Sequence, residues 1–150
     1  KDALLDALTH LLKASETSRV YIFENFEDPE DGLCLKLTYE VCAAGVSGNL
    51  DDPVLQHGVY NQGFDRWQQT LSQNKPILGL VETFPEGERL ILEPQGILSI
   101  LILPLWVDGK WFGFIGFDEN VMQARNVERQ GDVGLPRVDP VNLKCPGMLD

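Results

Sequence analysis

The strongest pattern in the sequence is a long apolar hairpin, Ile97-Leu-Ser-Ile-Leu-Ile-Leu-Pro-Leu-Trp-Val107 and Lys110-Trp-Phe-Gly-Phe-Ile-Gly-Phe-Asp118, joined by Asp108-Gly109. Asp-Gly favours a two-residue type I′ turn, because both central residues of that turn need a positive φ. Such a turn fixes the strand register and predicts Trp106 opposite Trp111. Counting back from this pair predicts Leu103 opposite Phe114 and Pro104 opposite Gly113.

Two more strands are predicted before the hairpin. Residues 19–26 are apolar at both odd and even positions, which is typical of a central strand covered on both faces. An acidic turn at 27–32 separates this strand from a run that alternates in polarity. One face of the second strand is expected to carry Leu33, Leu35, Leu37, Tyr39 and Val41. The other face is expected to carry Cys34, Lys36, Thr38, Glu40 and Cys42.

Helices are predicted at the start of the chain and in its middle. Residues 2–14 carry an amphipathic stripe made by Leu4, Leu5, Leu8, Leu11 and Leu12. Short helices are predicted at 52–57, at 64–72, and from a capping box at Thr83 and Glu86 to about Pro94. The order of helix, two strands, helical excursion and hairpin predicts an α+β fold, an antiparallel sheet with helices packed on it.

Composition and charge exclude several classes of function. A chain of 150 residues with 43% hydrophobic residues suits one globular domain, and no apolar run reaches the ~18 residues that a membrane span needs. A formal net charge of −11 disfavours nucleic acid and anionic membranes as partners.

The Gly- and Pro-rich residues 120–150 are expected to be an extended or disordered tail. Three cysteines form no disulfide framework, so we expect a cytoplasmic protein with Cys34 and Cys42 reduced.

Three stretches of the sequence resemble a GAF domain, the small-molecule-sensing module of signalling proteins. Residues 19–25 are similar to the first strand of many bacterial GAF domains, residues 86–105 to the passage from helix to strand, and residues 107–119 to the final hairpin. The resemblance covers about residues 1–119, and it is greatest to GAF domains attached to bacterial sensor histidine kinases and diguanylate cyclases.

The resemblance implies a GAF/PAS-like antiparallel sheet and a sensing or regulatory input function in a two-component or cyclic-di-GMP pathway. The domain itself would not be an enzyme, and its partner would be an output domain, a kinase or cyclase, elsewhere in the parent protein. A homodimer through the first helix is also expected. Of the Asn-Lys-Phe-Asp-Glu signature of cyclic-nucleotide-binding GAF domains, Phe117, Asp118 and Glu119 match the end.

Three alternatives stay open at this point. The chain could be a degenerate GAF module that only dimerises, an enzyme of the free methionine sulfoxide reductase type, or a cyclic-nucleotide-binding domain. For the reductase, Cys34 and Cys42 lie roughly 26 Å apart on one strand, too far to share a disulfide or a metal. Neither His10 nor His57 has a cysteine or carboxylate at ligand spacing beside it. No metal site, cofactor or nucleophilic triad is therefore predicted.

The candidate ligand site lies where the excursion at 43–82 covers the sheet. This segment is too long for a simple connection, and its aromatic residues can wall an apolar pocket. With the even positions of residues 97–107 facing that pocket, the expected ligand contacts are Tyr60, Phe64, Trp67, Ile100, Ile102 and Phe114. An acidic chain should prefer a neutral or cationic ligand, unless a local basic group such as Arg66 intervenes. The cluster of Glu82, Glu86 and Glu88 is expected to be a solvated helix start.

Overall fold

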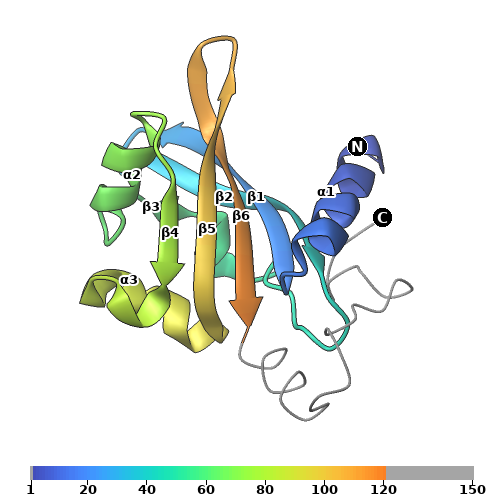
Figure 1. The fold of residues 1–150 in the computed structure, drawn as a ribbon. Helices are drawn as coiled ribbons and strands as arrows, with labels where there is room; N and C mark the ends of the chain where they lie inside the picture. The colour runs from blue at the N-terminus through green and yellow to red at the C-terminus, as the bar shows by residue number, and fades with distance from the viewer. Residues whose placement is uncertain (1, 121–150) are drawn as a thin grey trace.

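Six antiparallel strands form the sheet, in the order β3-β2-β1-β6-β5-β4 (Figure 1). The computed structural model describes residues 2–120. The strands are β1 (Arg19–Asp28), β2 (Gly32–Cys42), β3 (Gly58–Val59), β4 (Ile77–Leu80), β5 (Ile97–Val107) and β6 (Lys110–Asn120). β1 and β6, the first and last strands of the described residues, pair at the centre of the sheet. Asn120 ends β6, and the rest of the predicted tail lies outside the described residues.

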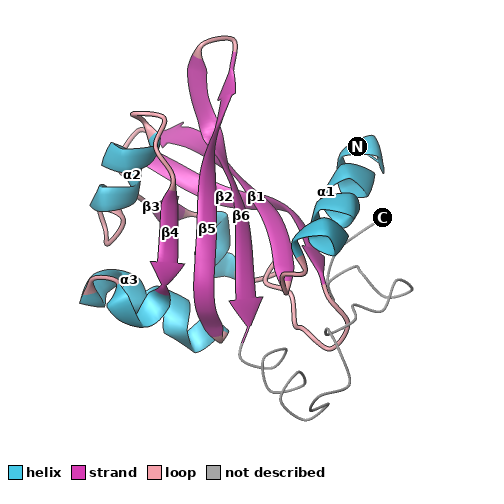
Figure 2. Ribbon diagram, viewed as in Figure 1, coloured by secondary structure: helices cyan, strands magenta, loops and turns pink. Residues whose placement is uncertain are grey.

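Helices pack on both faces of the sheet, which confirms the α+β class (Figure 2). The helices are α1 (Asp2–Ser15), α2 (Asp65–Leu71) and α3 (Glu86–Leu92), with the 3-10 turns η1 (Pro53–Gln56), η2 (Val81–Thr83) and η3 (Glu93–Gln95). On one face Leu8 and Leu12 of α1 are buried against β1 and β2. On the opposite face α2 and α3 cover a larger core. Among residues 2–120, no helix has the length and apolar character to span a membrane.

The leucine stripe of the first helix is divided between the core and the surface. Leu8 and Leu12 are fully buried, and Leu5 packs beside them. Leu4 and Leu11 remain exposed. The helix predicted at 2–14 is confirmed. Most of its leucine stripe packs on the sheet, which leaves less of it for the predicted homodimer.

The hairpin turn is confirmed, and a bulge then changes its register. Asp108 and Gly109 both have positive φ, and Trp106 lies opposite Trp111. Phe112 is then an extra residue, so Leu105 pairs with Gly113 rather than with Phe112. The register predicted beyond Trp106 is therefore wrong by one residue. Because opposed residues share a face, this shift brings three side chains to the same side of the sheet: Ile100, Ile102 and Phe114.

A second bulge, at Thr38, divides the predicted faces of β2. Ile22 pairs with Tyr39 and Phe23 with Leu37, so Thr38 has no partner in the ladder. An inserted residue reverses the direction of every later side chain. Leu35 and Leu37 therefore belong to the core under α2 and α3, whereas Tyr39 and Val41 face α1. Glu40 is only 1% exposed, so its assignment to a wetter face is wrong.

The middle of the chain confirms some predicted helices and adds two strands. η1 follows Asp52, whose carboxylate accepts a hydrogen bond from the N–H of Val54. α2 lies within the predicted 64–72, and α3 with η3 occupies the region predicted for the third helix. Thr83 is not the cap of α3, because its hydroxyl donates to the carbonyl of Leu80. The short strands β3 and β4 carry too little pattern to be predicted.

Glycine is required at Gly113, where β6 approaches β1. A Cβ at this position would lie 2.0 Å from the carbonyl oxygen of Phe23. We expect Gly113→Ala to lower the free energy of unfolding by about 3 kcal/mol, because the clash is with backbone and not with a side chain that can move. Chemical denaturation measures the change.

The matched control for this prediction is Gly87→Ala in α3. No atom lies within 4 Å of the Cβ position there, so alanine should be neutral or should stabilise by up to about 1 kcal/mol. Equal effects of the two substitutions would show that the contact between β1 and β6 is not tight.

Candidate functional site

A cavity of about 180 Å³ lies between the sheet and the segments that cover it. Strands β1, β2, β5 and β6 form its floor, and β3, α2, α3 and η3 contribute to its walls. The apolar part of its lining includes Phe23, Leu37, Phe64, Trp67 and Phe114. The polar part includes Glu40, Asn49, Gln95 and Asp118. An apolar cavity of about 150 Å³ accommodates a molecule of the size of benzene, so this space suits a small ligand.

Four of the six predicted contact residues line this cavity: Phe64, Trp67, Ile100 and Phe114. The other two are buried in the core beside it. Tyr60 donates its hydroxyl proton to the side-chain oxygen of Asn25, and Ile102 is fully buried opposite Gly116. The structure thus gathers most of the predicted residues in one place, and ligand contact at the four remains a prediction.

A buried ion pair closes the polar end of the cavity. Arg19 Nε donates to Asp118 Oδ1 at 3.0 Å, and both side chains are about 1% exposed. The other two guanidinium nitrogens donate to backbone carbonyls, Nη1 to Ser47 at 3.4 Å and Nη2 to Gln95 at 3.3 Å. One arginine therefore connects β1, β6, the excursion and η3.

Burial weakens the acids at this polar end. It raises the pKa of Asp118 to about 6, although the charge of Arg19 and hydrogen bonds from Arg19 and Tyr21 oppose the change. Burial also raises the pKa of Glu40, whose carboxylate accepts a hydrogen bond from the N–H of Asn49 at 2.7 Å. A ligand group that donates hydrogen bonds or carries positive charge would stabilise the ionised form of both acids.

Arg66 and Glu88 hold the aromatic wall in place. Arg66 Nε and Nη2 donate to the two carboxylate oxygens of Glu88 at 2.9 and 2.6 Å, and Trp67 Nε1 donates to Glu88 Oε1 at 2.7 Å. Glu88 is 2% exposed, so the prediction of a solvated acid is wrong for this residue. The reason is that the partners on α2 satisfy its carboxylate. Arg66 is thereby engaged within the protein.

The two cysteines of β2 differ in state. Cys34 is a free, buried thiol, and Cys42 is disulfide-bonded, so the expectation of two reduced thiols is wrong for Cys42. Burial and the charges of Asp28, Asp31 and Glu27 raise the pKa of the Cys34 thiol. A nucleophilic cysteine needs a lowered pKa, so Cys34 lacks the activation that thiol catalysis requires.

Sequence reasoning missed most of the polar residues that line the cavity. Asn49 lies in an irregular segment, and Gln95 lies in the short 3-10 turn η3, so neither follows a periodic pattern. The sequence places Glu40 on the wrong face because the bulge at Thr38 leaves no mark in the hydrophobic pattern. Asp118 was noted only as part of a signature. Its pairing with Arg19 joins strands that are distant in the sequence, and a local pattern does not encode it.

The ion pair gives a prediction for Arg19→Met. Removing the guanidinium leaves Asp118 and Glu40 buried without a counter-charge, so the free energy of unfolding should fall by roughly 3–5 kcal/mol at pH 7. Arg19 opposes the rise in the Asp118 pKa, so removing Arg19 moves that pKa further above about 6, and the variant then loses more stability than the unchanged chain as the pH rises. The loss in the variant should therefore be smaller at pH 5 than at pH 7, as measured by denaturation at both.

Arg89→Met is the matched control, because it breaks a partly exposed and longer pair with Glu93, 3.8 Å between Nη1 and Oε1. This change should cost less than about 1 kcal/mol and show no difference between the two pH values. A loss in Arg19→Met that is no larger than in the control would contradict the role given to the buried pair.

Comparison with known proteins relates the sequence to a signalling protein. No family model matches the chain. The chain is 39% identical over 116 residues to the methanogenesis regulatory histidine kinase FilI of Methanothrix harundinacea (strain 6Ac). The match covers 77% of the chain but only 13% of that kinase. The chain therefore corresponds to a small segment of this relative.

Solved structures show the same fold. The red/green cyanobacteriochrome NpR6012g4 in its red-light-absorbing state superposes with a TM-score of 0.63 at 12% identity, covering 79% of the chain and 76% of that structure. GAF3 from Slr1393 of Synechocystis sp. PCC6803 gives 0.61 at 18% identity with the same two coverages. The PixJ GAF domain of Thermosynechococcus elongatus gives 0.56 at 16% identity, covering 78% and 70%. At these identities the likeness concerns the fold alone.

Proposed function

Because residues 2–120 have the fold of a GAF domain, we propose that the chain is the small-molecule-sensing input domain of a signal-transduction protein with a histidine kinase output. The observation that carries the proposal is the cavity of about 180 Å³ between the sheet and its cover. The identity to a segment of a histidine kinase supports the kind of output.

The lining of the cavity defines the chemistry of the ligand. Phe64, Trp67 and Phe114 suit an aliphatic or aromatic body. Glu40 and Asp118 suit a group that donates hydrogen bonds or carries positive charge. With Arg66 engaged by Glu88 and Arg19 by Asp118, both nearby guanidinium groups already have carboxylate partners. The ligand is therefore a small neutral or cationic amphiphile.

The polar end of the cavity also offers a route for a signal. The N–H of Ser18 donates to the carbonyl of Asp118, and the N–H of Asn120 donates to the hydroxyl of Ser18. The start of β1 and the end of β6 are thus joined directly beside a residue that lines the cavity. A ligand that favours one arrangement of Asp118 would shift the population of this junction between β1 and β6.

In this proposal the domain binds and relays and does no chemistry. The raised pKa of Cys34 is opposite to what a reductase of the methionine sulfoxide type would need. Leu4 and Leu11 stay exposed on α1, and a homodimer through them is part of the proposal. In the parent protein that dimer would bring two output domains together.

The test first identifies a ligand and then measures its binding to variants in which a larger side chain fills the cavity. A fragment library of small amines and neutral amphiphiles is screened by thermal shift, and hits are titrated by calorimetry. Ile100→Phe and Leu37→Phe each place a larger side chain in the cavity, and we expect each to weaken binding of a hit by about tenfold or more.

Leu98→Phe is the matched control, because Leu98 lies on the same strand as Ile100 but is 40% exposed. It should leave binding unchanged. The proposal is contradicted if Leu98→Phe weakens binding of a hit as much as the cavity variants do, or if both cavity variants bind it as tightly as the unchanged chain. Either result would place the ligand outside the cavity.

A further inference from the structure

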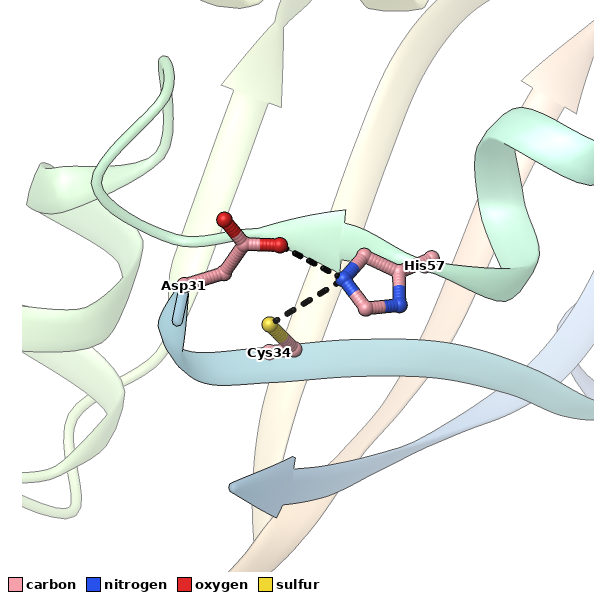
Figure 3. A group of neighbouring side chains, drawn as sticks. All are labelled: Asp31, Cys34 and His57. Atoms are coloured by element: carbon pink, nitrogen blue, oxygen red, sulfur yellow. Dashed lines mark hydrogen bonds and ion pairs between the residues drawn. The ribbon is translucent and has the colours of Figure 1, made fainter. Parts of the chain in front are cut away.

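Three metal-ligating side chains meet at the turn between β1 and β2: Asp31, Cys34 and His57 (Figure 3). His57 Nε2 lies 3.0 Å from Asp31 Oδ2 and 3.8 Å from Cys34 Sγ. One ligand atom from each residue falls within 4.8 Å of the other two. A second carboxylate, Asp28, places its Oδ2 at 3.8 Å from the same His57 nitrogen.

The backbone fixes these groups independently of any ion. Asp28 Oδ1 accepts hydrogen bonds from the N–H groups of Glu30 and Asp31, which holds the turn and leaves Oδ2 facing His57. Pairing of Cys34 with Val59 in the β2–β3 ladder brings His57 beside the thiol. The Phe26 ring packs against the imidazole in a T-shaped contact with the ring centroids 5.3 Å apart.

We propose that Asp31, Cys34 and His57 form a binding site for Zn²⁺ or a similar divalent transition metal, beside the carboxylate of Asp28. Thiolate, imidazole and carboxylate are the ligands that zinc takes in proteins. Bonds of about 2.0–2.3 Å in a tetrahedron keep the ligand atoms roughly 3.3–3.6 Å apart. His57 Nε2 lies 3.0 Å from Asp31 Oδ2 and 3.8 Å from Cys34 Sγ, within a few tenths of an ångström of that spacing, and all three ligand atoms lie within 4.8 Å of one another.

The charge at the site favours a cation. Asp28, Asp31 and Glu27 surround Cys34 with negative charge, and together with burial they raise the pKa of its thiol. A divalent ion would offset this repulsion and stabilise the thiolate, releasing the thiol proton to solvent. The Asp31 and His57 side chains are 39% and 45% exposed, so an ion can enter from solvent.

Metal binding would act on the wall of the ligand cavity. His57, Gly58 and Val59 line the cavity, and β3 pairs with β2 through only two residues. An ion held by the β1–β2 turn and by His57 would attach this short strand to the sheet. This inference goes beyond the sensing of a small molecule and does not depend on it.

The test uses the full chain without a histidine tag, after treatment with a chelator. Titration with Co²⁺ should give a thiolate-to-cobalt charge-transfer band and the strong visible bands of a tetrahedral site. Calorimetry should show saturable binding of one Zn²⁺, and the melting temperature should rise with it. We expect Cys34→Ser to abolish the charge-transfer band, and His57→Gln and Asp31→Asn to weaken Zn²⁺ binding by about tenfold or more.

His10→Gln is the matched control, since His10 lies exposed on α1, and it should bind Zn²⁺ as the unchanged chain does. Circular dichroism of each variant without metal separates a lost site from a lost fold, and the exposed Asp31→Asn keeps the test decisive if Cys34→Ser does not fold. The proposal is overturned if Zn²⁺ does not bind, or if it binds with equal affinity to the unchanged chain and to the folded ligand variants. The first of these results would show that the Asp31–His57 contact is only a surface ion pair.

Discussion

The buried pair of Arg19 and Asp118 is the constraint on which the rest of this structure depends. A guanidinium that is taken out of water needs a partner for its charge and for its N–H groups. Asp118 supplies the charge from β6, and the carbonyls of Ser47 and Gln95 accept the remaining contacts. Arg19 therefore joins the two central strands, β1 and β6, and holds the segments that carry Ser47 and Gln95 above the sheet. The cavity lies between these covering segments and the sheet.

Features set by neighbouring residues could be predicted from the sequence. The Asp108-Gly109 turn, the helix with Leu8 and Leu12, and the gathering of Phe64 and Trp67 over the sheet all follow from local pattern. The bulges at Thr38 and Phe112 could not be predicted, because inserting one residue in a ladder changes the faces without changing the polarity of the sequence. Contacts across the chain were missed for a similar reason. Arg19 and Asp118 come from opposite ends of the domain, and Cys34 and His57 are brought together by β3, a strand of two residues.

The inner cavity and the side-chain group at the β1–β2 turn suit different kinds of ligand. The inner cavity combines an aromatic wall, held by Glu88 and Arg66, with weakened acids at its far end. Its lining suits a small amphiphile, and through Asp118 it adjoins the junction between the start of β1 and the end of β6. The outer group at the β1–β2 turn suits a metal ion and adjoins the cavity only through His57. Under the proposed function, ligand binding would act on a histidine kinase output by shifting the population of two arrangements of the domain.

The most direct test of the proposed sensing function is methyl NMR of the chain, with labelled isoleucine, leucine and valine, titrated with a small cationic amphiphile. The methyl groups of Leu35, Leu37 and Ile100 line the cavity, and those of Leu8 and Leu12 lie on the other face under α1. The account predicts saturable shifts in the first group and none in the second. Shifts confined to the α1 face, or none at any cavity methyl across the range of ligands, would contradict it.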